Sequence, residues 1–165
     1  YQMMGRELRD PEGIEGGVSR TLPGLGLFDM TTTFGDYSKR VVNSEGRMLV
    51  GDGGDITGYE LHMGMSEVRE EPLFEITNNF DRERVTDGAV REDEMLYGTY
   101  LHGIFDRRPF RAHFLSRITH GGERYDASDS RDYGEILEEN LERLADVFES
   151  NLDMDAVMRM LGVGE

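Results

Sequence analysis

The chain has 165 residues, a length that suits one compact domain with its own core. It carries 34 acidic and 18 basic residues, for a net charge of −16, and such a surface repels nucleic-acid phosphates, so a DNA or RNA partner is not expected. The absence of cysteine excludes disulfides and thiolate metal sites and favours a cytoplasmic protein, and the apolar runs stay below the roughly 18 residues of a membrane span.

The first half of the chain is expected to form mainly strands. Residues 1–8, YQMMGREL, predict a short helix, which the prolines and glycines of residues 9–17 break. Runs rich in threonine, aliphatic and aromatic residues then predict strands. These are residues 27–34, residues 39–49 with a turn near Glu45 and Gly46, residues 56–64, residues 73–77 and residues 96–105. A polar loop is expected over residues 78–93, within which residues 88–90 begin a short hairpin strand.

The second half is expected to be helical. Asp106 is predicted to cap a helix that ends near residue 118, whose apolar residues recur at the spacing of one buried stripe. This stripe consists of Phe110, Phe114 and Ile118. After a loop, a longer helix is predicted over residues 133–150. Its apolar face consists of Ile136, Leu137, Leu141, Leu144, Ala145 and Phe148. Asp153 is expected to cap a last helix ending at Gly162. Strands followed by helices indicate an α/β layer structure.

Two segments of similar sequence each contain a histidine. In GYELHMG, strand alternation places Glu60 and His62 on one face; in GTYLHGIF, Tyr100 and His102 share a face. A histidine at the end of a strand can serve as a general base, because its pKa lies near neutral pH. It can equally be a hydrogen-bonded structural residue, and the residues themselves do not decide between the two.

The other two histidines and the glycines near residue 24 give weaker evidence of a functional site. His113 is expected on the surface of the helix after Asp106, and His120 in a loop. No two of the four histidines show the close helical spacing of a metal motif, so no metal site is expected. Gly24 and Gly26 precede a strand instead of opening a helix, which argues against a phosphate-binding loop.

Several segments resemble the C-terminal glutamine amidotransferase domain of cobyric acid synthases. The two histidine segments, GYELHMG and YGTYLHGIFD, carry this resemblance together, and YQMMGRELRDPEG, GLGLFDMTTTF and LADVFESNLDMDAVMRML are also similar. The resemblance covers nearly the whole chain. It implies a class I glutamine amidotransferase-like, flavodoxin-like α/β fold with a mixed sheet flanked by helices. Residues 1–165 are then expected to be the C-terminal portion of that domain, without the nucleophile-elbow segment and the N-terminal synthetase domain that precede it in the family.

The resemblance also implies an activity. Family members hydrolyse glutamine with a Cys–His pair, and a synthetase domain with ATP and Mg then uses the ammonia to amidate side-chain carboxylates of a corrin in cobalamin biosynthesis. Tyr1 and Gln2 match the end of the family's G-x-C-G-G-Y-Q pattern, so the nucleophile itself is expected outside this sequence and the chain alone is expected to be inactive. His102 would be the catalytic base, and Gln2, Glu60 and His62 would contact the substrate glutamine. No cofactor is expected in this chain.

One departure and two alternatives remain. Many related glutaminases have an acid two residues after the histidine, where this chain has Ile104. What orients His102 is therefore open, with Asp106 as one candidate. The alternatives are a glutaminase of the cobyrinate a,c-diamide synthase type, which more often has a second histidine at the position of Ile104, and a degenerate module that binds a partner without catalysis.

Overall fold

The larger of the two main sheets is antiparallel throughout. The computed structural model describes residues 1–35, 41–79, 82–120, 123–126 and 131–163. Five strands are ordered β11-β5-β4-β7-β8. Their bounds are β4 Val42–Met48, β5 Asp55–Glu60, β7 Phe74–Asn78, β8 Arg84–Asp87 and β11 Leu101–His102. Along β4, Ser44 and Met48 are buried while the residues between them are partly or fully exposed. One face of this sheet therefore packs on the core and the other faces solvent.

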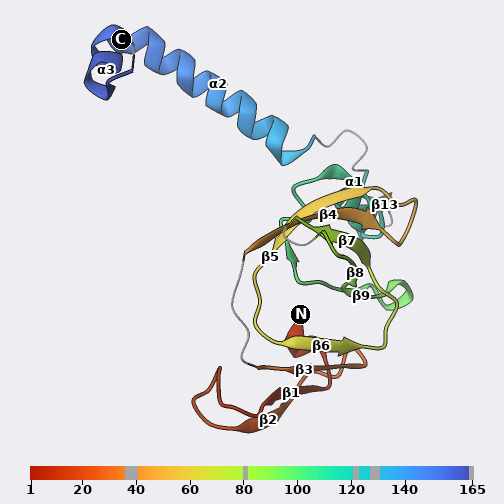
Figure 1. Cartoon of the computed structure of the whole chain (residues 1–165). Helices are drawn as coiled ribbons and strands as arrows, with labels where there is room; N and C mark the ends of the chain where they lie inside the picture. The colour runs from red at the N-terminus through yellow and green to blue at the C-terminus, as the bar shows by residue number, and fades with distance from the viewer. Residues whose placement is uncertain (36–40, 80–81, 121–122, 127–130, 164–165) are drawn as a thin grey trace.

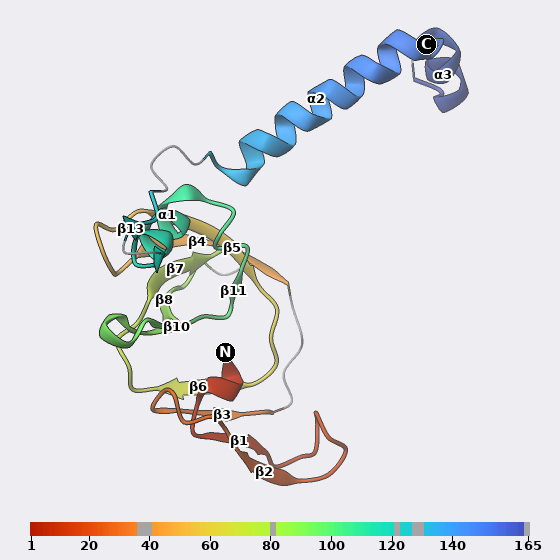
Figure 2. The ribbon, with the colours of Figure 1, turned by 180° about the vertical axis from the view of Figure 1, so that it is seen from behind.

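The smaller sheet contains the first strands of the chain and one strand from its middle. Its order is β2-β1-β3-β6, with a parallel pair β1–β3. The bounds are β1 Glu7–Asp10, β2 Arg20–Pro23, β3 Met30–Thr33 and β6 Met65–Val68. A 3₁₀ turn, η1 Gln2–Met4, precedes it. The N-terminus lies on the side of β3 and β6 that faces the larger sheet (Figures 1 and 2).

Helices and short strand pairs complete the fold. Helix α1 (Arg108–Ser116) packs on the larger sheet, where Phe110 meets Phe74 with ring centroids 5.4 Å apart. The main core cluster consists of Met48, Ile56, Leu73, Phe74, Ile76, Val90, Leu101, Ile104 and Phe110. A second cluster, of Phe28, Met30 and Ala89, lies beside Tyr1. The short elements are β9 Ala89–Arg91 with β10 Leu96–Gly98, η2 Glu92–Glu94 between them, and the pair β12 Thr119–His120 with β13 Glu123–Arg124.

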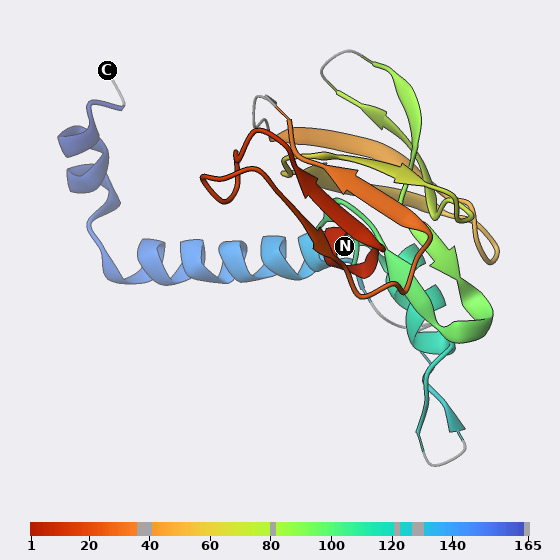
Figure 3. The ribbon, with the colours of Figure 1, turned by 90° about the horizontal axis from the view of Figure 1, so that it is seen from below.

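The two C-terminal helices have the predicted positions but bury no residue. They are α2 (Tyr133–Asn151) and α3 (Met154–Leu161), and the Asp153 carboxylate caps α3 by accepting the amide of Ala156 at 3.0 Å. Helix α2 projects from the sheets (Figures 1 and 3), and the leucines of its predicted apolar face are exposed. No helix in the described ranges is long and apolar enough to cross a membrane.

The expected mixed α/β architecture, with sheets flanked by helices, is confirmed, but two early predictions are wrong. The helix predicted over residues 1–8 is reduced to the 3₁₀ turn η1, because Glu7 to Arg9 pair with β3 and the Arg6 amide donates to the Met30 carbonyl at 2.8 Å. No turn occurs at Gly46, which lies in the middle of β4. A Cβ there would sit 2.1 Å from the carbonyl oxygen of Glu75 on β7, so close strand contact explains the glycine.

Other boundaries also differ from the sequence predictions. The run 56–64 is a strand only as far as Glu60, where β5 ends, and residues 61–64 form the connection to β6 in the other sheet. The run 96–105 is divided between β10 and β11. Strand β8 lies within the expected polar loop, whereas the predicted hairpin strand at 88–90 is confirmed as β9. Asp106 does not cap α1, and Ile118 lies beyond its end. The Arg108 amide instead donates to the Asp132 carboxylate, at 2.5 Å.

Candidate functional site

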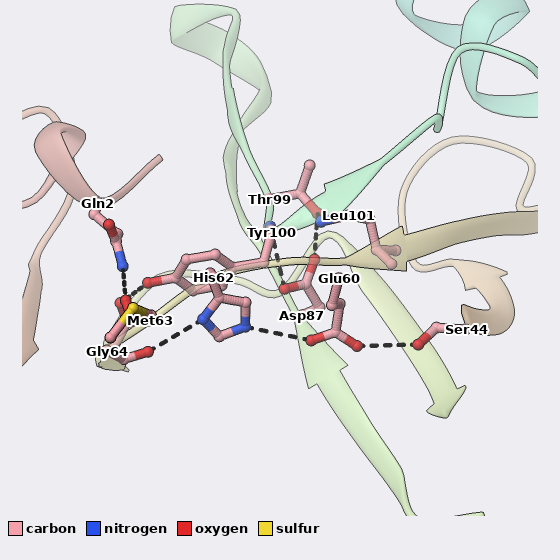
Figure 4. A network of polar contacts seen from close by, with 11 residues as sticks. Gln2, Ser44, Glu60, His62, Met63, Gly64, Asp87, Thr99, Tyr100 and Leu101 are labelled. Atoms are coloured by element: carbon pink, nitrogen blue, oxygen red, sulfur yellow. Dashed lines mark hydrogen bonds and ion pairs between the residues drawn. The ribbon is translucent and has the colours of Figure 1, made fainter. Parts of the chain in front are cut away.

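The first histidine segment forms a polar cluster where β5 ends. Glu60 is the last residue of β5, and its Oε2 lies 3.5 Å from Nε2 of His62 (Figure 4). Its other oxygen accepts a hydrogen bond from Ser44 Oγ at 3.0 Å. Hydrogen bonding to His62, and more weakly to Ser44, lowers the pKa of the Glu60 carboxyl, although partial burial opposes the shift. The cluster therefore keeps a carboxylate ionised beside an imidazole.

His62 is fixed on several sides. Its Nδ1 lies 3.2 Å from the carbonyl oxygen of Gly64, so both ring nitrogens face acceptor oxygens. The ring stacks on Tyr100, with centroids 3.7 Å apart and planes 20° from parallel. The Tyr100 hydroxyl lies 2.5 Å from Ser66 Oγ, which in turn lies 2.7 Å from Thr32 Oγ1. These contacts connect His62 to β6 and β3 of the smaller sheet.

Gln2 joins the same region from the N-terminal turn. Its Nε2 donates to the carbonyl oxygen of Met63, the residue after His62, at 2.6 Å (Figure 4). Of the four residues predicted for the site, the structure thus brings Gln2, Glu60 and His62 together. The side-chain amide of Gln2 contributes to holding the loop after His62 against η1.

His102 lies on the other face of the strand pair. It is the last residue of β11, is exposed, and stacks on Tyr59 with centroids 5.0 Å apart. Its neighbour Leu101, 4% exposed, points into the core and pairs in register with Glu60. Gly103 then adopts φ +79°, a conformation that favours glycine, and the Asp106 amide donates to its carbonyl at 2.9 Å. This turn presents His102 at the edge of the larger sheet.

Sequence reasoning missed one residue of this region, Asp87. It ends β8, is 8% exposed, and its carboxylate accepts hydrogen bonds from Thr99 Oγ1 and from the Tyr100 amide (Figure 4). Burial raises the pKa of the Asp87 carboxyl, and the hydrogen bonds from Thr99 and Tyr100 act against this shift. The Asp-Gly pair at this position signals only a turn, so the sequence held no sign of the contact.

The remaining histidines lie elsewhere. His113, expected on the surface, has a side chain only 13% exposed, and its Nε2 lies 3.1 Å from Glu92 Oε1. His120 is in β12 and not in a loop. Within the described ranges, no three histidine or acidic residues are grouped so that they could hold a metal ion.

Comparison with known proteins decides the family. The model of the CobB/CobQ-like glutamine amidotransferase domain matches residues 1–110, which include both histidine segments. The chain belongs to this family. The domain is also 37% identical over 163 residues to a protein of Methanococcus maripaludis and 36% identical over 171 residues to one of Methanosarcina mazei, both named "Probable cobyric acid synthase". A "Cobyric acid synthase" of Paracoccus denitrificans is 38% identical over 162 residues.

The matches cover this chain almost entirely but the relatives only in part. They include 96%, 99% and 97% of the chain, against 32%, 32% and 30% of the three relatives. The chain therefore spans about a third of the length of these curated relatives, and it corresponds to their C-terminal part.

Proposed function

We propose that this chain is the C-terminal portion of the glutaminase domain of a cobyric acid synthase. The observation that carries the proposal is similarity over almost the whole chain to proteins of that name, at 36–38% identity. The domain would release ammonia from glutamine. A synthetase domain that uses ATP and Mg would consume the ammonia to amidate corrin carboxylates, in a cytoplasmic enzyme of cobalamin biosynthesis.

His102 is the proposed general base. In this reaction the imidazole takes the proton of a cysteine thiol, and the thiolate attacks the side-chain amide carbon of glutamine. The proton then passes to the departing ammonia, and water hydrolyses the thioester to glutamate. The exposed position of His102 at the end of β11, before the Gly103 turn, leaves its ring open to a group approaching from outside these residues.

The chain contains no cysteine, so the nucleophile would have to come from outside residues 1–165. We expect the isolated chain to be inactive for this reason. A second candidate is a non-catalytic binding module, since no cysteine nucleophile lies within residues 1–165. A glutaminase of the cobyrinate a,c-diamide synthase type has no comparable observation in its favour, since Ile104 stands where that group more often has a histidine.

Gln2, Glu60 and His62 are proposed to contact the amino-acid end of bound glutamine. Glu60 offers a carboxylate for an ammonium group, and its lowered pKa keeps it charged near neutral pH. Because Glu60 and His102 lie on opposite faces of the β5–β11 pair, substrate would have to reach across the strand ends, where the loop after His62 and the Gly103 turn lie.

A chimera tests the proposal. Residues 1–165 would replace the matching C-terminal segment of the Methanosarcina mazei relative, and amidation would be measured with glutamine and with ammonium as nitrogen source. We expect His102→Gln to lower the glutamine-dependent rate by about 100-fold or more, the usual contribution of a general base, and to leave the ammonium-dependent rate unchanged. His113→Gln, in the pair with Glu92, is the matched control and should preserve both rates.

The outcomes separate the candidates. Equal loss with both nitrogen sources, or no loss, would reject His102 as the base. A parent chimera that uses ammonium but not glutamine would favour the non-catalytic module, because the restored upstream segment supplies the thiol.

A further inference from the structure

The path of the chain between β10 and β11 depends on side chains instead of a strand ladder. Thr99 and Tyr100 interrupt the two strands. Thr99 Oγ1 donates to Asp87 Oδ2 and accepts the Leu101 amide at 2.9 Å, while the Tyr100 amide donates to Asp87 Oδ1 at 3.4 Å. The buried Asp87 carboxylate and the Thr99 hydroxyl thus accept the backbone amides of the two residues after Thr99, where the strand pairing is interrupted.

Asp87 is itself firmly placed. It pairs in register with Phe74, a fully buried residue of β7, and its carbonyl oxygen accepts the Leu73 amide at 3.1 Å. The carboxylate therefore extends from the larger sheet at a fixed position. Its two oxygens meet donors from two consecutive residues, which fixes both the position and the direction of the Thr99–Tyr100 segment.

Both histidine stacks adjoin this segment. Tyr100, whose amide Asp87 binds, stacks on His62. His102 follows two residues later and stacks on Tyr59. A displacement of the Thr99–Tyr100 backbone would move the Tyr100 ring away from His62 and change the register in which β11 meets β5.

We propose that Asp87 is a positioning residue that orients both histidines of the site through Thr99 and Tyr100. Its importance for glutamine hydrolysis rests on the proposed function, but the positioning itself does not. Related glutaminases carry an acid two residues after the histidine, and this chain does not. Here Asp87 takes the place of that acid, because the segment before His102, and not the one after it, orients the His102 ring.

The test uses this chain in solution by NMR. In the unsubstituted protein, we expect nuclear Overhauser contacts between the rings of His62 and Tyr100 and between those of His102 and Tyr59. Asp87→Ala should remove or weaken both contacts and make the Tyr100 and Leu101 amides exchange with solvent about tenfold faster, the effect of losing one ordinary hydrogen bond. Asp10→Ala is the matched control. Asp10, at the end of β1 in the smaller sheet, is also buried, at 3% exposed, and its carboxylate accepts the amides of residues 14–16 in the connection to β2.

A second pair of variants keeps the test decisive if Asp87→Ala does not fold. Thr99→Val keeps the size of the side chain and removes the hydroxyl, so it should reproduce the loss of both ring contacts. Thr99→Ser keeps the hydroxyl and should restore them. Retention of both ring contacts and of parent exchange rates in Asp87→Ala or Thr99→Val would overturn the proposal, as would loss of the contacts in Asp10→Ala to the same extent.

Activity then separates this inference from the proposed function. In the chimera, Thr99→Val should lower the glutamine-dependent rate more than the ammonium-dependent rate, and Thr99→Ser should recover it. If the ring contacts depend on Asp87 but His102→Gln leaves glutamine use intact, the positioning role stands and the catalytic assignment fails. If His102→Gln abolishes glutamine use while the ring contacts survive in the Asp87 and Thr99 variants, the positioning role fails alone.

Discussion

Replacing Glu60 by glutamine tests the polar cluster at the end of β5. Glutamine has nearly the same shape but no charge, so it weakens the contact with His62 Nε2 at 3.5 Å and the hydrogen bond from Ser44 at 3.0 Å. The Glu60 side chain is 23% exposed, so solvent screens part of its attraction to His62. The cost of removing the carboxylate from water offsets a further part of that attraction. Hydrogen bonds to charged groups then suggest a loss of about 1–2 kcal/mol in the free energy of unfolding at pH 7.

The pH dependence gives the sharper test. The folded state lowers the pKa of Glu60 from its ordinary value of 4.5, so its contribution is present above that pH and is lost as the pH falls through the folded pKa. Urea unfolding at pH 7, 5, 4 and 3.5 should show the difference between parent and Glu60→Gln narrowing below about pH 4.5. Glu45→Gln, on the exposed face of β4, removes the same charge from a chain of net charge −16 and is the matched control. A difference that stays constant to pH 3.5, or that equals the effect of Glu45→Gln, would refute the reasoning.

Two further substitutions test the packing that supports the site. Gly46→Val should destabilise the larger sheet by about 2 kcal/mol or more in urea unfolding, because a Cβ would meet the Glu75 backbone at 2.1 Å. Gly134→Ala in α2, where a Cβ would meet nothing within 4 Å apart from its chain neighbours and the backbone of its own helix, should leave stability equal or raise it by up to about 1 kcal/mol. Phe110→Ala should cost about 3–5 kcal/mol, since Phe110 is 1% exposed, whereas Phe105→Ala, at 45% exposed, should cost about half as much. Equal losses at Phe110 and Phe105 would contradict the position of the core.

Local sequence patterns predicted the structure correctly where residues close together in the chain determine it. The helix over 133–150 follows from apolar periodicity, and the Asp153 cap from its position before α3. The histidine segments were recognised because a strand end followed by glycine is a local feature. Strand alternation placed Glu60 and His62 on one face, whereas the addition of Gln2 to this group was suggested only by resemblance to the family.

The errors share a physical cause, which is contact between residues distant in the chain. Alternation alone makes residues 56–64 a single strand, but β5 pairs with β4 only as far as Glu60, and the chain then leaves this sheet for β6, which pairs with β3. Asp106 precedes α1 and looks like its cap, yet Asp132, 24 residues after Arg108, binds the free amide. The role of Asp87 depends on Thr99, 12 residues away. A local sequence pattern does not predict contacts between residues so far apart in the chain.

The crossing of the chain from β5 of the larger sheet to β6 of the smaller one has a consequence for how the protein folds. In chain order, β6 of the smaller sheet comes between β5 and β7 of the larger one, so the two sheets are interleaved. The β4–β5 and β7–β8 hairpins join neighbouring segments and are expected to form early, whereas β6 must find β3 across a closed loop that contains β4 and β5. His62 lies in the connection between β5 and β6. We therefore expect its surroundings to be completed in a late step of folding, when the two sheets join.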